Sequence, residues 1–206
     1  MKRLSGFLFF TLFCVSCSQK ATHLVEDFEP LLANGNINVV IEIPTGTNEK
    51  FEVEKTTGTL QLETLENGQP RRINYLPYPF NYGMVPRTLL PKKLGGDGDP
   101  LDVFVLGKPI EKGTVIECKL IGVLKLLDRG EQDDKLIAVS EGSIFYHIND
   151  LKTLDEEFPG VLDISKIWFI NYKGKGKMQF KGFGDTSVSD HILKTSITVY
   201  KQLHKK

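Results

Sequence analysis

The chain has 206 residues, of which 40% are hydrophobic, and it carries 26 basic and 26 acidic side chains. This length allows one domain with a sizeable core. The balanced charge argues against a protein that binds nucleic acid or an anionic membrane through a basic face. The 19 Gly and 10 Pro residues, with short runs of Val, Ile and Thr, favour β structure with many turns.

The N-terminal segment has the pattern of an export signal. Residues 1–3 are basic at positions 2 and 3, and residues 4–15 are almost wholly apolar but too short to span a membrane comfortably. Small residues stand directly before Cys17, as in bacterial lipoproteins, although Cys14 occupies a position where a leucine is usual. We predict a lipoprotein-type signal peptide over residues 1–17, with Cys17 lipidated and the protein facing the periplasm or cell envelope. An ordinary secretory signal cut nearby is the alternative.

The signal is followed by a polar, irregular stretch, residues 18–35, which predicts a tether between the anchor and a domain over residues 36–206. If Cys17 is lipidated, Cys118 is the cysteine left in the domain, so no internal disulfide is expected. Cys118 lies in a strand-like segment without a nearby activating His or helix start. We interpret it as a packed thiol.

Short strands are predicted in the first half of the domain. Residues 39–44 form an apolar strand interrupted by Glu42, which needs a cation or a hydrogen-bond donor if it is buried. Residues 50–55 alternate with a period of two, which places Lys50 and Glu52 on one charged face. Such a face is also typical of a half-solvated strand.

A loop and an aromatic segment follow the short strand at residues 59–62. The loop ends in Arg71 and Arg72, whose guanidinium groups suit planar carboxylates or phosphates. Residues 75–83 are rich in Tyr and Pro, and their prolines exclude a helix. The tyrosines of this segment either pack in the core or donate hydrogen bonds to an anion.

A turn in the middle of the chain gathers three carboxylates, Asp97, Asp99 and Asp102, directly before the apolar run 103–106. All three can border one pocket, and hard oxygen ligands suit Mg²⁺, Mn²⁺ or Ca²⁺ better than zinc. A solvated surface turn is the alternative, because Asp-Gly and Asp-Pro are ordinary turn dipeptides.

A second acidic cluster, residues 128–135, follows a long β-rich run that contains a predicted bulge at Gly122. The strand 136–139 comes next. Since two loops carry clustered carboxylates and a strand carries Glu42, we expect these groups at one end of a closed sheet.

The C-terminal part changes to helical periodicity. Residues 161–170 predict a helix with a broad apolar face, and residues 178–183 predict a last strand. A final helix is predicted to begin at a cap, Ser187 or Ser189. Its expected buried stripe consists of Ile192, Ser196, Val199 and Leu203.

In their order along the chain, these segments resemble the family I soluble inorganic pyrophosphatases. The similarity rests on Asp97-Gly98-Asp99-Pro100-Leu101-Asp102, which has the family's D-[GS]-D-P-x-D form. Supporting motifs occur in the family's order over about residues 36–205: Ile41–Pro44, Lys50–Glu52, Asn81–Gly83, Gly122–Lys125, Asp128, Asp133–Lys135 and Tyr172-Lys173.

The resemblance implies a mainly β, α+β fold, a five-stranded OB-like closed β-barrel with flanking α-helices. It implies hydrolysis of pyrophosphate to two phosphates with three or four Mg²⁺ ions, for which Mn²⁺ or Zn²⁺ could substitute. It also implies a homo-oligomer, either a hexamer or a dimer. An inactive OB-like lipoprotein that binds a metal or a polyanion is the alternative function.

The resemblance also assigns roles to individual residues. The implied metal ligands are Asp97, Asp102, Asp128 and Asp133, with Glu42 and Glu52 acting on the metals or their waters. Asp99 corresponds to the general base. The implied phosphate-binding residues are Lys50, one of the two arginines, Tyr82, Lys135, Tyr172 and Lys173, with Tyr78 close by. Of the arginines we favour Arg72, because an apolar residue follows it as in the family.

Overall fold

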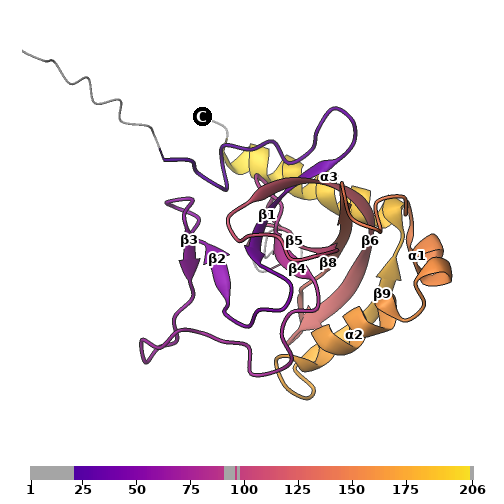
Figure 1. The fold of residues 1–206 in the computed structure, drawn as a ribbon. Coiled ribbons are helices and arrows are strands. Elements are labelled where there is room, and N and C mark those ends of the chain that lie inside the picture. The colour runs from indigo at the N-terminus through magenta and orange to yellow at the C-terminus, as the bar shows by residue number, and fades with distance from the viewer. Residues whose placement is uncertain (1–20, 91–95, 97, 205–206) are drawn as a thin grey trace, which may run out of the picture.

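The computed structural model describes residues 21–90, 96 and 98–204, and within them the chain forms a closed sheet, a two-stranded hairpin and three helices (Figure 1). Five strands make a ring: β1 (Ile37–Ile43), β4 (Asn81–Met84), β5 (Asp102–Leu106), β8 (Lys135–Ser140) and β6 (Val115–Asp128). Each strand pairs with the next in this order, and β6 pairs again with β1. The pairing of β5 with β8 is parallel, and the other pairings in the ring are antiparallel. The expected barrel is confirmed.

The longest strand, β6, extends beyond the ring. Its C-terminal half pairs with β9 (Met178–Gly184) and with the short β7 (Glu131–Gln132). The register between β6 and β8 shifts between Leu120 and Gly122, which confirms the predicted bulge. A Cβ atom at Gly122 would lie 2.6 Å from the side chain of Leu151, so glycine allows the first helix to approach the sheet.

Strands β2 (Phe51–Val53) and β3 (Leu60–Leu62) form a hairpin beside the barrel. The hairpin is joined to the barrel by Glu42 on β1, whose Oε1 accepts a hydrogen bond from the backbone N–H of Val53 at 2.8 Å. The buried carboxylate therefore has the donor that its apolar surroundings required.

Three helices lie on the outside of the barrel, α1 (Leu151–Glu157), α2 (Val161–Asn171) and α3 (Thr186–Leu203). Helix α2 contacts α1 and β9, while α3 lies along β6 and β9 (Figure 1). Helix α2 confirms the prediction for residues 161–170. Helix α1 was not predicted. It begins at Asp150, whose side chain accepts a hydrogen bond from the Thr153 N–H.

The details of α3 differ from the prediction. Its N-cap is Asp185, whose carboxylate accepts from the Val188 N–H at 3.0 Å, whereas Ser189 Oγ donates to the Thr186 carbonyl inside the first turn. The helix thus begins before either predicted serine. The buried face is also rotated about the helix axis. It consists of Ser189, Leu193, Ser196, Ile197 and Tyr200.

Of the predicted stripe, Ser196 is buried, Ile192 and Val199 are half-buried, and Leu203 is 65% exposed. The contacts of α3 with the sheet, and not the apolar pattern alone, determine which face of the helix is covered.

Strand β4 was not predicted because the proline-rich segment before it hides its pattern. It contains Gly83, where an added Cβ would lie 1.8 Å from the carbonyl oxygen of Val40 on β1. Only glycine permits this close approach of the two backbones.

The side chain of Cys118 is fully buried in the core, and burial raises the pKa of its thiol to about 12. This environment confirms a packed thiol.

The described part of the predicted tether, residues 21–35, lies against the barrel. Val25 is buried in a cluster with Met84 and Tyr200, and its carbonyl accepts from the Arg87 N–H at 3.1 Å. The proposed lipidation residue, Cys17, is outside the described residues. Across the part of the chain that is described, no helix combines the length and apolar character needed to cross a membrane.

Candidate active site

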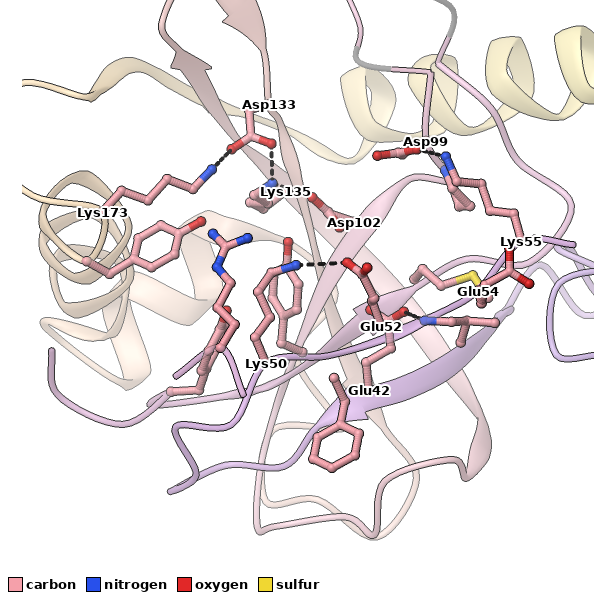
Figure 2. Close-up of a pocket in the computed structure, with 18 residues that line it drawn as sticks. Glu42, Lys50, Glu52, Glu54, Lys55, Asp99, Asp102, Asp133, Lys135 and Lys173 are labelled. Atoms are coloured by element: carbon pink, nitrogen blue, oxygen red, sulfur yellow. Dashed lines mark hydrogen bonds and ion pairs between the residues drawn. The ribbon is translucent and has the colours of Figure 1, made fainter. Parts of the chain in front are cut away.

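One end of the barrel and the β2–β3 hairpin enclose a cavity of about 410 Å³ that is lined mainly by charged side chains (Figure 2). Its lining comes from β1, β4, β5, β8, the hairpin and the C-terminal end of α2. It includes eleven of the predicted site residues: Glu42, Lys50, Glu52, Tyr78, Tyr82, Asp99, Asp102, Asp133, Lys135, Tyr172 and Lys173. Segments more than a hundred residues apart in the chain thus contribute to one site.

Lys135 lies at the base of this cavity. Its side chain is 1% exposed, and its Nζ donates to Asp102 and, at 2.7 Å, to Oδ1 of Asp133. Burial lowers the pKa of Lys135, but the negative charges of Asp102 and Asp133 raise it by a larger amount. The net shift of the pKa is upward. The ammonium group therefore stays charged between the two carboxylates.

Lys173 follows α2 and lies between Asp128 and Asp133, two residues of the second acidic cluster. Its Nζ donates to Oδ2 of Asp128 at 2.8 Å and lies 3.7 Å from Oδ2 of Asp133. Asp133 lines the cavity, whereas Asp128 lines an adjacent hollow. The structure therefore places Asp128 beside the cavity, at one remove from the other predicted ligands.

The hairpin supplies a cluster of opposite charges. Lys50 Nζ lies 3.2 Å from Glu52 and 2.7 Å from Glu63, and Glu63 also accepts a hydrogen bond from Arg71. Burial raises the pKa of Glu63, but the hydrogen bonds from Lys50 and Arg71 lower it by a larger amount. The net shift of the pKa is downward. Glu63 was not predicted. The hairpin register, which pairs Phe51 with Leu62, places Glu63 opposite Lys50, and this pairing is visible only in the structure.

The two arginines take different positions, and Arg72, the one favoured from the sequence, lies outside the cavity. Arg71 lines the cavity, whereas the side chain of Arg72 is 68% exposed and lies 3.5 Å from Glu49. The backbone of Arg71 pairs with Lys50 and Glu63. Because successive side chains of an extended segment point in opposite directions, only one of the two arginines can face the cavity.

Asp99 lies at the rim of the cavity, where its carboxylate forms an ion pair with Lys55 at the end of the hairpin strand (Figure 2). Both side chains are about half exposed. Lys55 and its neighbour Glu54 were not predicted as site residues, although both line the cavity. Asp97, the third carboxylate of the turn, lies outside the described residues.

Three tyrosines form one wall of the site. Tyr78 lies 5.3 Å from Tyr82 and 6.4 Å from Tyr172, measured between ring centroids, and Tyr172 stacks on Trp168. Burial raises the pKa of all three phenols. They therefore remain protonated near neutral pH and can donate hydrogen bonds to an anion.

Glu42 lies deepest among the acidic groups of the site. The pKa of its carboxyl is raised to about 8, mainly by burial. The hydrogen bond from Val53 lowers this pKa, and the negative charge of Asp102 raises it. A cation bound beside Glu42 would stabilise its ionised form.

The acidic groups of the cavity and of its edge supply oxygen donors of the kind that a hard divalent cation prefers. Oδ2 of Asp133 and Oδ1 of Asp128 are buried and have no hydrogen-bond partner. Within residues 21–90, 96 and 98–204, no three Asp, Glu, His or Cys side chains are close enough to hold one ion. Lys135 separates Asp102 from Asp133. The oxygen donors nevertheless have the chemistry that Mg²⁺ requires, and two of their atoms accept no hydrogen bond.

Comparison with known proteins identifies similar chains. The family model described as "Inorganic pyrophosphatase" matches residues 39–201. An inorganic pyrophosphatase of Campylobacter jejuni is 35% identical over 169 residues, which cover 80% of this chain and 92% of that protein. One from Xylella fastidiosa is 35% identical over 170 residues, covering 80% and 89%.

Solved structures agree with the sequence comparison. The inorganic pyrophosphatase of Helicobacter pylori matches with a TM-score of 0.72 at 31% identity, over 85% of this chain and 99% of that chain. A truncated vacuolar soluble pyrophosphatase of Trypanosoma cruzi, in complex with PPi, matches with a TM-score of 0.79 at 26% identity, over 90% and 76% of the two chains. The barrel and the arrangement of its flanking helices are thus shared with this group.

Proposed function

The chain belongs to the inorganic pyrophosphatase family, and from this premise we propose that it hydrolyses pyrophosphate with Mg²⁺ as cofactor and Asp99 as general base. The observation that carries the proposal is the charged cavity. It gathers six acidic and five basic side chains, so it can hold cations and a polyanion together.

We assign the metal ions to the carboxylates around Lys135. Asp102 and Asp133 would bind metal directly, together with Asp97 and Asp128, and Glu42 and Glu52 would act on the metals or their waters. When bound, three or four Mg²⁺ ions would neutralise the substrate and lower the pKa of water, and Mn²⁺ or Zn²⁺ could replace them.

The basic and phenolic groups bind the substrate in this proposal. Lys50, Lys135 and Lys173, with Arg71 in the place first given to Arg72, contact phosphoryl oxygens from different sides of the cavity. The protonated phenols of Tyr78, Tyr82 and Tyr172 add hydrogen bonds.

Asp99 accepts the proton of the attacking water in this proposal. As the water oxygen forms a bond to phosphorus, the bond to the bridging oxygen breaks and phosphate leaves. Lys55 holds the Asp99 carboxylate at the rim of the cavity, and this contact limits the directions in which the base can point.

Phosphate release from pyrophosphate by the chain lacking residues 1–17 tests the function. We expect release that requires Mg²⁺, stops in EDTA and returns when Mg²⁺ is restored. An absence of release at saturating Mg²⁺ would instead support the inactive metal- or polyanion-binding alternative.

We further propose that the enzyme is an exported lipoprotein anchored through Cys17, on the support of the signal-like segment 1–17.

We also propose that the protein forms a homo-oligomer. Leu76, Ile164 and Ile167 are each more than half exposed, and Leu76 lies beside α2 because its carbonyl accepts from Trp168 Nε1 at 3.0 Å. Exposed apolar groups of this kind favour association, which sedimentation of the purified protein would test.

A further inference from the structure

The segment before the barrel, residues 23–29, connects the barrel to the tip of the β2–β3 hairpin, and we call it the N-terminal strap. The Leu24 N–H donates to the carbonyl of Gly58 at 3.0 Å, in the turn that joins β2 to β3 (Figure 1). Val25 is buried in one cluster with Val53 of β2 and with residues of β1 and β4. The strap therefore contacts the hairpin and the barrel together.

The ring of His23 fits against the hairpin turn. A Cβ atom at Gly58 would lie 2.3 Å from the imidazole, so the ring can occupy this place only because the turn has a glycine there. Nδ1 of His23 accepts from the Glu26 N–H at 3.2 Å, and Nε2 lies 3.3 Å from the carbonyl oxygen of Thr56. A neutral imidazole with its proton on Nε2 satisfies both contacts. The strap thus holds the ring on one side and the hairpin turn on the other.

The strap also holds the segment that follows β4. The Val25 carbonyl accepts from the Arg87 N–H at 3.1 Å, and the guanidinium group of Arg87 donates to Glu29. Arg87 has a φ of 50°, a left-handed conformation that is uncommon for a residue with a side chain. Three residues later, the Leu90 N–H donates to the carbonyl of Asp99 at 3.2 Å. The strap is therefore connected, through this short segment, to the residue proposed as the general base.

The two elements that the strap holds meet at the rim of the active-site cavity. Lys55 comes from the hairpin turn and pairs with Asp99 from the opposite side of the rim (Figure 2). Thr56, which contacts His23, directly follows Lys55 in the chain. Residues 23–29 are all described, and none of them lines the cavity. The strap can thus act on the site only through the elements that it holds.

We infer that the N-terminal strap positions the hairpin and Asp99 for the hydrolysis of pyrophosphate, with His23 and Val25 as positioning residues. This inference rests on the proposed function of the cavity. Without the strap, the tip of the hairpin would lose its contacts with the barrel. Lys50 and Lys55 would then take up a wider range of positions relative to the groups on the barrel, and fewer molecules would have the productive arrangement.

The test measures KM and kcat for pyrophosphate, with Mg²⁺, in four forms of the full chain. These are the wild type, the double variant His23→Ala/Val25→Ala, the conservative variant His23→Gln/Val25→Ile, and the control Ile197→Ala. The conservative variant keeps a hydrogen-bond donor and an apolar side chain at the two positions. Ile197 is buried on α3, in a core cluster formed mainly by α3 and the barrel, so its truncation lowers stability away from the hairpin. Hydrogen exchange and thermal unfolding are measured for each form.

We expect the double variant to lower kcat/KM about tenfold at a temperature where it remains folded. Amides of residues 51–62 should exchange faster, whereas those of β5 and β8 should not change. The conservative variant should recover most of the loss, and Ile197→Ala should lose stability but keep the kinetics of the wild type. In a Lys55→Ala background the double change should cost less than in the wild type, because the contact that it disturbs is already absent.

The inference is overturned if the double variant keeps the kinetics of the wild type. It is also overturned if Ile197→Ala loses as much activity, which would indicate general instability. If the double variant does not fold, His23→Ala is measured alone, and wild-type kinetics of that variant have the same meaning. A wild type inactive on pyrophosphate would refute the proposed function instead. Unchanged exchange of residues 51–62 in the double variant would, in that case too, show that the strap does not hold the hairpin.

Discussion

The carboxylate of Glu42 accepts a 2.8 Å hydrogen bond from the backbone N–H of Val53, and this contact joins the barrel to the β2–β3 hairpin. The hairpin and its two ends present Lys50, Glu52 and Lys55 to the cavity. The position of these groups relative to Asp102 and Lys135 on the barrel therefore depends on a buried carboxylate.

This contact predicts a pH dependence of stability in the metal-free protein. Burial raises the pKa of Glu42 to about 8 from 4.5, so between these values the folded state holds a proton that the unfolded state has lost. The contribution of Glu42 to the free energy of unfolding is fully present below pH 4.5 and is lost as the pH rises through about 8. We expect Glu42→Gln, which stays neutral, to flatten this part of the pH profile of Tm measured in EDTA. Glu141→Gln, at an exposed position, is the control, and an unchanged profile for Glu42→Gln would contradict the prediction.

Asp102→Asn should remove most of the activity while preserving the fold. The change takes away a proposed metal ligand but leaves Lys135 paired with Asp133 at 2.7 Å. We expect kcat for pyrophosphate to fall by about a hundredfold or more, with a stability loss of about 1–3 kcal/mol. Phosphate release and urea unfolding measure the two effects. Near-normal turnover would show that Asp102 is not required.

Arg71→Ala and Arg72→Ala form a matched pair. Arg71 lines the cavity and Arg72 is 68% exposed, so removal of Arg71 should raise KM for pyrophosphate about tenfold more than removal of Arg72. Steady-state kinetics of the two variants decides this. A larger effect at Arg72 would restore the assignment made from the sequence.

Glu63 should act through the two cations that it holds. Glu63→Ala would release both Lys50, at 2.7 Å from Glu63, and Arg71, and both would lose their preferred orientation. We expect KM for pyrophosphate to rise several-fold with a smaller change in kcat, and we expect Glu63→Asp to recover part of the loss. If kcat alone falls, Glu63 has a different role.

Replacement of Cys17 tests the proposed anchor. In a bacterial host that processes lipoproteins, we expect the wild type in the membrane fraction and Cys17→Ser in the soluble fraction, because the thiol is the point of lipid attachment. Fractionation followed by immunoblotting measures the distribution. A wild type found in the soluble fraction would refute the anchor.

The motifs of the chain predicted the family, the type of fold and most of the cavity lining. The reason is that these features depend on local order. The D-G-D-P-L-D turn, the alternating Lys50–Glu52 strand and the Tyr172-Lys173 pair after α2 each keep their chemistry wherever the fold brings them. The sequence likewise predicted the long β6 and its bulge at Gly122, because a run of strand-forming residues and a glycine inside it are both local features of the sequence.

The tertiary structure decided the features that depend on partners distant in sequence. Whether Arg71 or Arg72 faces the cavity followed from backbone pairing with Lys50 and Glu63. The rotation of α3 toward Leu193 and Ile197 followed from its contact with β6. An apolar or basic residue shows its type in the sequence, but the direction of its side chain is set by the strand or helix packed against it. Most of the charged and phenolic residues that line the cavity were therefore predicted from the sequence, whereas Glu54, Lys55, Arg71 and the geometry of the cavity required the fold.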